Sequence, residues 1–233
     1  MRTMQQLRAG AVSQLRGIWK VLFFLYLPIA LLFLAVGLLS RVIKGASLAF
    51  FLRDVVATGK LPFFAGFVSQ LGGILWSAAL TICLFAWIMM QRQSGEFTSS
   101  KRFLLQGSFL TGLLLLDDIF LFHEEVAPEY LHISELIVFA VYMIVGIVFV
   151  FSNWKEIFSS EYIILMIAFG MFAASIFLDA LPLDSFHLRY FWEQLELFLE
   201  DGFKFAGIAT WLTYFARYAM TRFEVISGTG EVS

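Results

Sequence analysis

Long stretches without a single charged residue constrain this chain more than any other feature. Five of them cover residues 21–40, 61–91, 103–116, 136–154 and 162–178. An α-helix rises 1.5 Å per residue, so about 20 predominantly apolar residues cross the roughly 30 Å hydrocarbon layer of a bilayer. Each stretch can therefore form the body of one membrane-spanning helix, and the pattern predicts a helical bundle in a membrane.

The composition excludes a soluble globule. Hydrophobic residues make up 60% of the 233 residues and charged residues only 15%, against roughly a quarter charged in soluble domains. The 28 Phe, 8 Met and 6 Trp are too many to hide in one soluble domain of this size, whereas lipid can cover a helix that is apolar all round. A lone cysteine, Cys83, excludes a disulfide framework within the chain.

A sixth span is possible only if charge enters the membrane. The last apolar block, residues 205–216, is 12 residues long, which is about 18 Å of helix. Its helix must recruit the turns that carry Glu196, Glu200, Asp201 and Lys204, and the third helix must include Asp117 and Asp118. We therefore expect an all-α polytopic bundle, a single domain over residues 1–233 with about six helices at 18–40, 66–91, 103–123, 136–154, 161–180 and 192–217.

The distribution of basic residues predicts that both termini are cytoplasmic, because cytoplasmic segments are rich in Lys and Arg. With the N-terminus inside, ten of them lie inside: Arg2, Arg8, Arg16, Lys20, Arg92, Lys101, Arg102, Lys155, Arg217 and Arg222. The basic segment 41–60 is the exception, and we expect a short interfacial helix there. Trp19, Trp87, Trp154 and Trp211 then fall near inner helix ends, as in an aromatic belt.

Acidic residues and histidines gather at the opposite, outer side. All three histidines, His123, His132 and His187, lie there with 12 of the 18 acidic residues, and such residues bind divalent metals or titrate protons. If the third helix is continuous through residue 125, Asp117 and Glu124 share one face and His123 closes its outer end. Asp118 shares a face with Gly107 and Thr111, where we expect room for a neighbouring backbone or small ligand.

A second acidic stripe lies on the last helix. Glu193, Glu196, Glu200 and Lys204 are spaced by three, four and four residues, with Asp201 adjacent. One interpretation is that Lys204 only neutralises Glu200 on its own helix. The other is that this stripe meets the carboxylates of the third helix, since neither group can face lipid. The summed negative charge then requires shared protons or a divalent metal ion, and the candidate ligands are Asp117, Asp118, His123, Glu124, Glu196, Glu200 and Asp201.

Two blocks carry a resemblance. Leu-Asp-Asp-x-Phe-x-x-His-Glu at 116–124 and Leu-Glu-Asp-Gly-x-Lys-x-x-Gly at 199–207 resemble a family of uncharacterised bacterial multi-pass membrane proteins. The resemblance implies location in the bacterial inner (plasma) membrane and assigns no activity. The ceramidase and adiponectin-receptor type of membrane hydrolase needs a pair of intramembrane histidines at i and i+4, which this sequence lacks.

Three classes of function are compatible with the sequence. The first is a membrane protein with an outward-facing cluster that binds a divalent cation or shared protons. The second is a membrane metalloenzyme acting on a lipid or other hydrophobic substrate. The third is an accessory subunit whose charges pair with a protein partner or a second copy of the chain. A zinc-protease motif, a hydrolase nucleophile elbow, a phosphate loop and a basic nucleic-acid surface are all absent from the sequence.

Overall fold

The computed structural model describes residues 2–43, 47–92, 98–179 and 189–227, and all regular secondary structure in these ranges is helical. The chain divides into two compact units, Met1–Ala65 and Gly66–Ser233. The predicted organisation as one membrane domain stays a prediction, whereas the predicted all-α class agrees with the described residues.

The first unit contains one long helix and two short ones. Helix α1 (Arg2–Val42) contains the 21-residue segment Leu22–Val42, which has a mean hydropathy of 2.7 and no buried residue. Instead of one short interfacial helix after α1, there are two, α2 (Leu48–Leu52) and α3 (Val55–Gly59). The chain is extended at Arg53, and the Asp54 carboxylate starts α3 by accepting hydrogen bonds from the backbone N–H groups of Val56 and Ala57.

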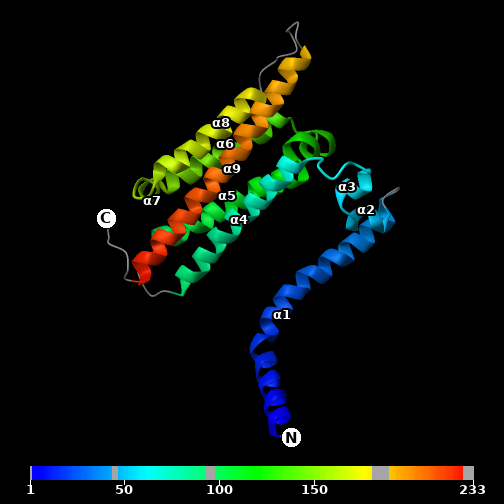
Figure 1. Ribbon diagram of the computed structural model, residues 1–233, viewed down its shortest axis with the longest axis vertical. Helices are drawn as coiled ribbons and strands as arrows, with labels where there is room; N and C mark the ends of the chain where they lie inside the picture. Colours follow the sequence, from blue (N-terminus) through cyan, green and yellow to red (C-terminus); the bar gives the residue numbers. More distant parts are fainter. Residues whose placement is uncertain (1, 44–46, 93–97, 180–188, 228–233) are drawn as a thin grey trace. The chain divides into compact units, whose positions relative to one another are not determined.

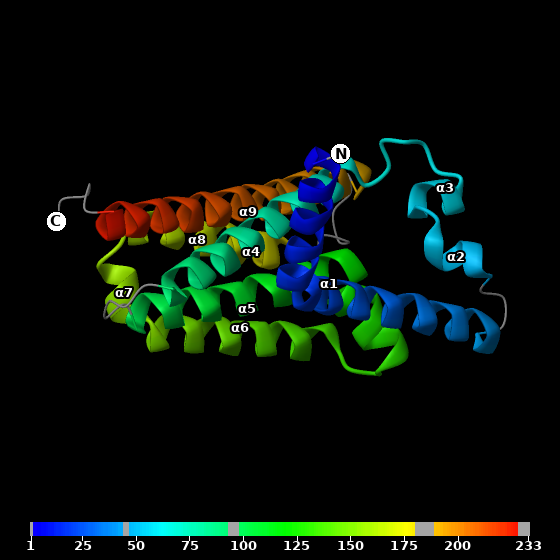
Figure 2. The ribbon, with the colours of Figure 1, turned by 90° about the horizontal axis from the view of Figure 1, so that it is seen from below.

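The second unit is a bundle of long helices (Figures 1 and 2). Its elements are α4 (Phe67–Gln91), α5 (Thr98–Phe120), the π-helix η1 (Phe122–Tyr130), α6 (Glu135–Ser152), α7 (Trp154–Phe158), α8 (Tyr162–Asp179) and α9 (Arg189–Ser227). Helix α9 packs against α8 and α4, and α4 packs against α5. In Figure 2, α4 lies between α9 and α5, and α6 lies on the other side of α5.

Aromatic rings fill the centre of this bundle. Trp211 on α9 is fully buried, and its indole N–H donates a hydrogen bond of 3.0 Å to the Thr111 hydroxyl on α5. The Phe215 ring lies so close to Gly107 that an added Cβ would be 2.7 Å away from it. We expected room on this face for a neighbouring backbone or a small ligand, and the neighbour is helix α9. Trp211 is a core residue, and its predicted place in an interfacial belt was wrong.

Five helices in the described ranges are long and apolar enough to cross a membrane: Leu22–Val42, Phe67–Gln91, Thr98–Phe120, Glu135–Ser152 and Tyr162–Asp179. Most of their large apolar side chains are exposed on the protein surface. In water such a surface would aggregate, whereas in a bilayer it is covered by lipid. Helix α9 extends beyond the apolar block 205–216 and includes the turns that carry Glu200, Asp201 and Lys204. This extension was predicted from the sequence.

The connections place charged groups at both ends of the bundle. At one end α5 meets η1, and this end carries His123; we call it the His123 end. At the other end the start of α5, α7 and the last turns of α9 come together around Arg222, and we call this the Arg222 end.

Candidate functional site: charge clusters at both ends of the bundle

The His123 end is shaped by an interruption of the helix at Leu121. This residue has a left-handed backbone (φ 49°), ends α5 and is followed by η1. Non-glycine residues rarely adopt this conformation, and π-helical turns are rare and frequently lie at functional sites. The break turns His123 back towards α5, so its backbone N–H donates to the Asp117 carboxylate at 3.0 Å. The expected continuous helical face through Asp117 and Glu124 was therefore wrong.

Asp117 and His123 form the centre of a buried hydrogen-bonded cluster. The His123 Nδ1 atom lies 2.7 Å from Asp117 Oδ2, and the Tyr142 hydroxyl of α6 donates to Asp117 Oδ1 at 2.7 Å. On the other side of the ring, Nε2 lies 3.3 Å from Glu124 Oε1. The Phe139 ring packs 4.9 Å from the imidazole, measured between centroids. Three elements, α5, η1 and α6, are thus joined through one imidazole.

The two carboxylates stabilise the charged form of His123. Burial acts to lower the pKa of His123, but the hydrogen bonds and negative charges of Asp117 and Glu124 outweigh burial and raise it to about 9. The same contact with His123 holds the pKa of Glu124 below its usual range. Both ring nitrogens face a carboxylate, and an imidazole can donate from both nitrogens only as the imidazolium. The geometry therefore fits a His123 that carries its proton at neutral pH.

Asp118 faces the other way and meets α9. Lys204 Nζ lies 2.7 Å from Asp118 Oδ1, and the Asp118 side chain is only 6% exposed. The expected meeting of the two acidic helices is confirmed for this pair. Lys204 does not serve only its own helix, because its ion pair with Asp118 crosses to α5. Gly72 on α4 lies beside this pair, since a Cβ there would be in ordinary van der Waals contact with Asp118 Oδ2, at 3.6 Å.

The remaining candidate residues make no close contact with this pair that the structure describes. Asp201 is exposed and Glu200 is half-buried, and the charges of Lys204 and Glu124 act on both. The Glu196 side chain and the whole of His187 lie outside the described residues. His132 is exposed, with a left-handed backbone. Among the described side chains, no group of three or more His, Cys, Asp or Glu residues is arranged to hold a metal ion.

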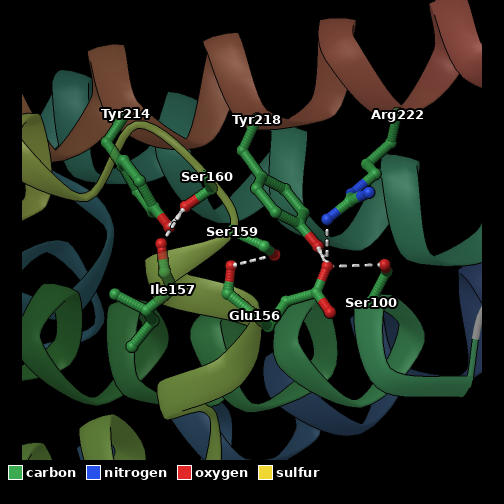
Figure 3. A network of polar contacts seen from close by, with 8 residues as sticks. All are labelled: Ser100, Glu156, Ile157, Ser159, Ser160, Tyr214, Tyr218 and Arg222. Atoms are coloured by element: carbon green, nitrogen blue, oxygen red, sulfur yellow. Dashed lines mark hydrogen bonds and ion pairs between the residues drawn. The ribbon is translucent and has the colours of Figure 1, made fainter. Parts of the chain in front are cut away.

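Sequence reasoning missed a second buried cluster at the Arg222 end, shown in Figure 3. Glu156 of α7 accepts hydrogen bonds from the Tyr218 hydroxyl, from Arg222 and, at 2.7 Å, from the Ser100 hydroxyl. Burial acts to raise the pKa of Glu156, but these donors and the Arg222 charge outweigh it and hold that pKa below its usual range. The Arg222 guanidinium also lies 5.1 Å from the Tyr218 ring centroid.

Two neighbouring contacts extend this cluster along α9. The hydroxyls of Tyr214 and Ser160 lie 2.8 Å apart, and the exposed Arg217 pairs with Glu161. A sequence signal for the cluster exists, because Tyr214, Tyr218 and Arg222 are spaced by four residues and share one helix face. In the sequence, Arg222 was used only as one of the Lys and Arg residues that mark cytoplasmic segments. For this reason the cluster was missed.

The fold and these clusters define an integral membrane protein of the all-α class, with buried charge at both ends of one bundle. The chain belongs to the family described as a domain of unknown function, DUF8692, whose model matches residues 24–218. That range includes every described member of the His123 cluster. No curated protein and no solved structure matches this chain.

Proposed function

We propose that the protein is a membrane-embedded proton-binding module, in which His123, Asp117 and Glu124 share protons at one membrane face. The observation that carries the proposal is the bridging position of His123, whose two ring nitrogens each face a carboxylate. Histidine is the side chain whose unperturbed pKa places its change of charge between pH 5 and 8, and neighbouring carboxylates shift that pKa upward. Because a carboxylate lies on each side, the charge of this imidazole decides whether both carboxylates have a hydrogen-bond donor.

Loss of the proton has a structural consequence. A neutral His123 can donate from only one nitrogen, so a carboxylate that faces the other nitrogen loses its partner. Asp117 also holds α6 through Tyr142, and Phe139 of α6 packs on the same imidazole. Proton release therefore changes the charge beside the Tyr142–Asp117 hydrogen bond that attaches α6 to α5, and this couples proton occupancy to helix packing.

The distribution of basic residues indicates which end of the bundle faces the cytoplasm. We infer six crossings, with α9 as the sixth and both termini in the cytoplasm, because Lys155, Arg217 and Arg222 lie at or near the Arg222 end. The His123 end then faces outward, and His123 releases its proton when the external pH rises towards about 9. The resemblance to bacterial multi-pass membrane proteins favours the plasma membrane of a bacterium as its location.

A divalent cation is the second candidate occupant. Glu200 and Asp201 lie within electrostatic reach of Glu124 and Lys204, and carboxylate oxygens suit hard cations. A metal there would compete with Lys204 for these carboxylates. The metalloenzyme and the accessory subunit, completed by a protein partner or second copy, stay predictions from the sequence.

The proposal is tested by the stability of the detergent-solubilised protein between about pH 6 and 9.5. A histidine whose pKa is raised on folding contributes stability that is complete below its unfolded value and is lost as pH rises through its folded value. Here that window runs from about 6.5 to about 9 and is worth about 3 kcal/mol. The wild type should lose this stability towards high pH, and His123→Gln should be less stable at pH 6 and nearly independent of pH.

The matched control is His132→Asn, which changes an exposed histidine to a residue that tolerates its left-handed backbone. This variant should keep the pH dependence of the wild type. Equal pH dependence in His123→Gln and wild type would contradict the proton module. Stabilisation by Mg²⁺ or Mn²⁺ that a chelator reverses, together with no effect of pH, would favour the cation instead.

A further inference from the structure

An apolar cavity of about 680 Å³ lies between α5, η1 and α6 near the His123 end. Its wall includes Leu113 and Leu116 of α5, Val126 of η1, and Ile137 and Val141 of α6. Asp117 and Tyr142 also line it, but they are hydrogen-bonded to each other. The cavity therefore presents hydrocarbon to whatever enters it.

The cavity is an open groove and not an enclosed void, because several of its lining side chains are exposed on the surface of the bundle. Water is a poor occupant, because a bound water needs two to four polar partners and the free lining is hydrocarbon. In a bilayer, hydrocarbon covers such a surface. At 680 Å³ this cavity falls within the usual range of ligand pockets, roughly 300 to 1,000 Å³.

The surroundings identify the kind of ligand. Helices α5 and α6 are both long and apolar enough to span the bilayer, and the lining side chains Leu116 and Ile137 are more than half exposed, at 55% and 54%. The cavity is thus continuous with the lipid-facing surface of α6, and the hydrocarbon available to it is an acyl chain of the bilayer.

Charge at the cavity's outer end selects the headgroup. Residues 122–142, which include η1 and the first half of α6, contain four glutamates and no Lys or Arg, and with Glu124 paired to His123 three further carboxylates remain, Glu125, Glu129 and Glu135. Glu125 and Glu129 are exposed on η1, the helix that contributes Val126 to the wall. Carboxylates attract an ammonium group and repel a net anionic headgroup.

We propose that this cavity is a lipid site that holds one acyl chain of a zwitterionic, amine-bearing phospholipid, with the ammonium group facing the glutamates of η1. The bound chain fills the space between α5 and α6 beside the Tyr142–Asp117 hydrogen bond. The site depends on the membrane location of α5 and α6 and not on proton binding by His123, so each can fail without the other.

The test is photolabelling of the full-length protein in vesicles that contain phosphatidylethanolamine with a diazirine on one acyl chain. Labelled peptides are mapped by mass spectrometry. We expect labelling of residues 113–142 to fall roughly threefold or more in Ile137→Trp, whose ring fills the cavity. The matched control is Ile144→Trp, an exposed position on the same helix outside the lining, and it should label like wild type. Val141→Phe is a second filling variant if Ile137→Trp does not fold.

The headgroup is tested by the same chain probe on phosphatidylglycerol. We expect labelling of residues 113–142 to be roughly threefold or more weaker than with phosphatidylethanolamine. Equal labelling by both lipids would overturn the assigned headgroup. Equal labelling of the two filling variants and the Ile144→Trp control would overturn the cavity as a lipid site.

Discussion

The Arg222 cluster allows a quantitative test of buried charge. Arg222→Met removes the cation beside Glu156, whose side chain is 9% exposed. Breaking a buried ion pair by removing one partner costs about 3 to 5 kcal/mol. The hydroxyls of Tyr218 and Ser100 still donate to Glu156, and the Arg222 side chain is 22% exposed, so we expect the lower part of that range. About 3 kcal/mol corresponds to a melting temperature lower by roughly 6 to 12 °C in a unit of this size.

The assay is thermal unfolding in detergent, followed by far-ultraviolet circular dichroism. Glu156→Gln combined with Arg222→Met should recover a large part of the loss, because the neutral amide still accepts hydrogen bonds and leaves no unpaired charge. Arg217→Met is the matched control on the same helix, since its pair with Glu161 is about half exposed and such pairs contribute little. Equal melting temperatures for Arg222→Met and Arg217→Met would refute a special contribution from the buried pair.

Two further predictions concern packing and topology. Gly107→Ala should lower the melting temperature clearly, because its Cβ would lie 2.7 Å from the Phe215 ring, whereas Gly146→Ala should not, since no atom lies within 4 Å of its Cβ; unfolding of both variants checks this, and equal values would contradict the close approach. Reporter fusions after Asn153 and after Glu129 should report the cytoplasm and the outside respectively, and the same side for both would contradict the proposed topology.

The sequence predicts the helices well because lipid imposes a simple rule. A segment without charge and of bilayer length becomes a helix, so the 136–154 prediction agrees with α6 (Glu135–Ser152) within two residues at each end. The same rule favours a meeting of the acidic third helix with the last helix, because neither set of charges is stable against lipid, and the structure shows this meeting in the pair of Asp118 with Lys204. These features depend on composition along the chain, which the sequence shows directly.

The details of the His123 end depend on a single backbone conformation. Nothing in the run Ile119–Leu121 signals that Leu121 adopts a left-handed conformation, since leucine is a good helix former. The π-helix that follows, and the resulting contact of His123 with Asp117 six residues earlier, therefore escaped prediction. Similarly, burial of Trp211 depends on its packing against Thr111 and the rings around it, which hydropathy does not show.

Nuclear magnetic resonance of the His123 ring nitrogens tests most directly whether this residue is an imidazolium held between two carboxylates. A variant with His132→Asn and His187→Gln leaves His123 as the sole histidine, so isotope-labelled histidine reports this ring alone. We predict two protonated ring nitrogens at neutral pH and deprotonation with a pKa of about 9. A neutral ring at pH 7, or a pKa at or below the ordinary value of about 6.5, would contradict the imidazolium and with it the proton-binding module.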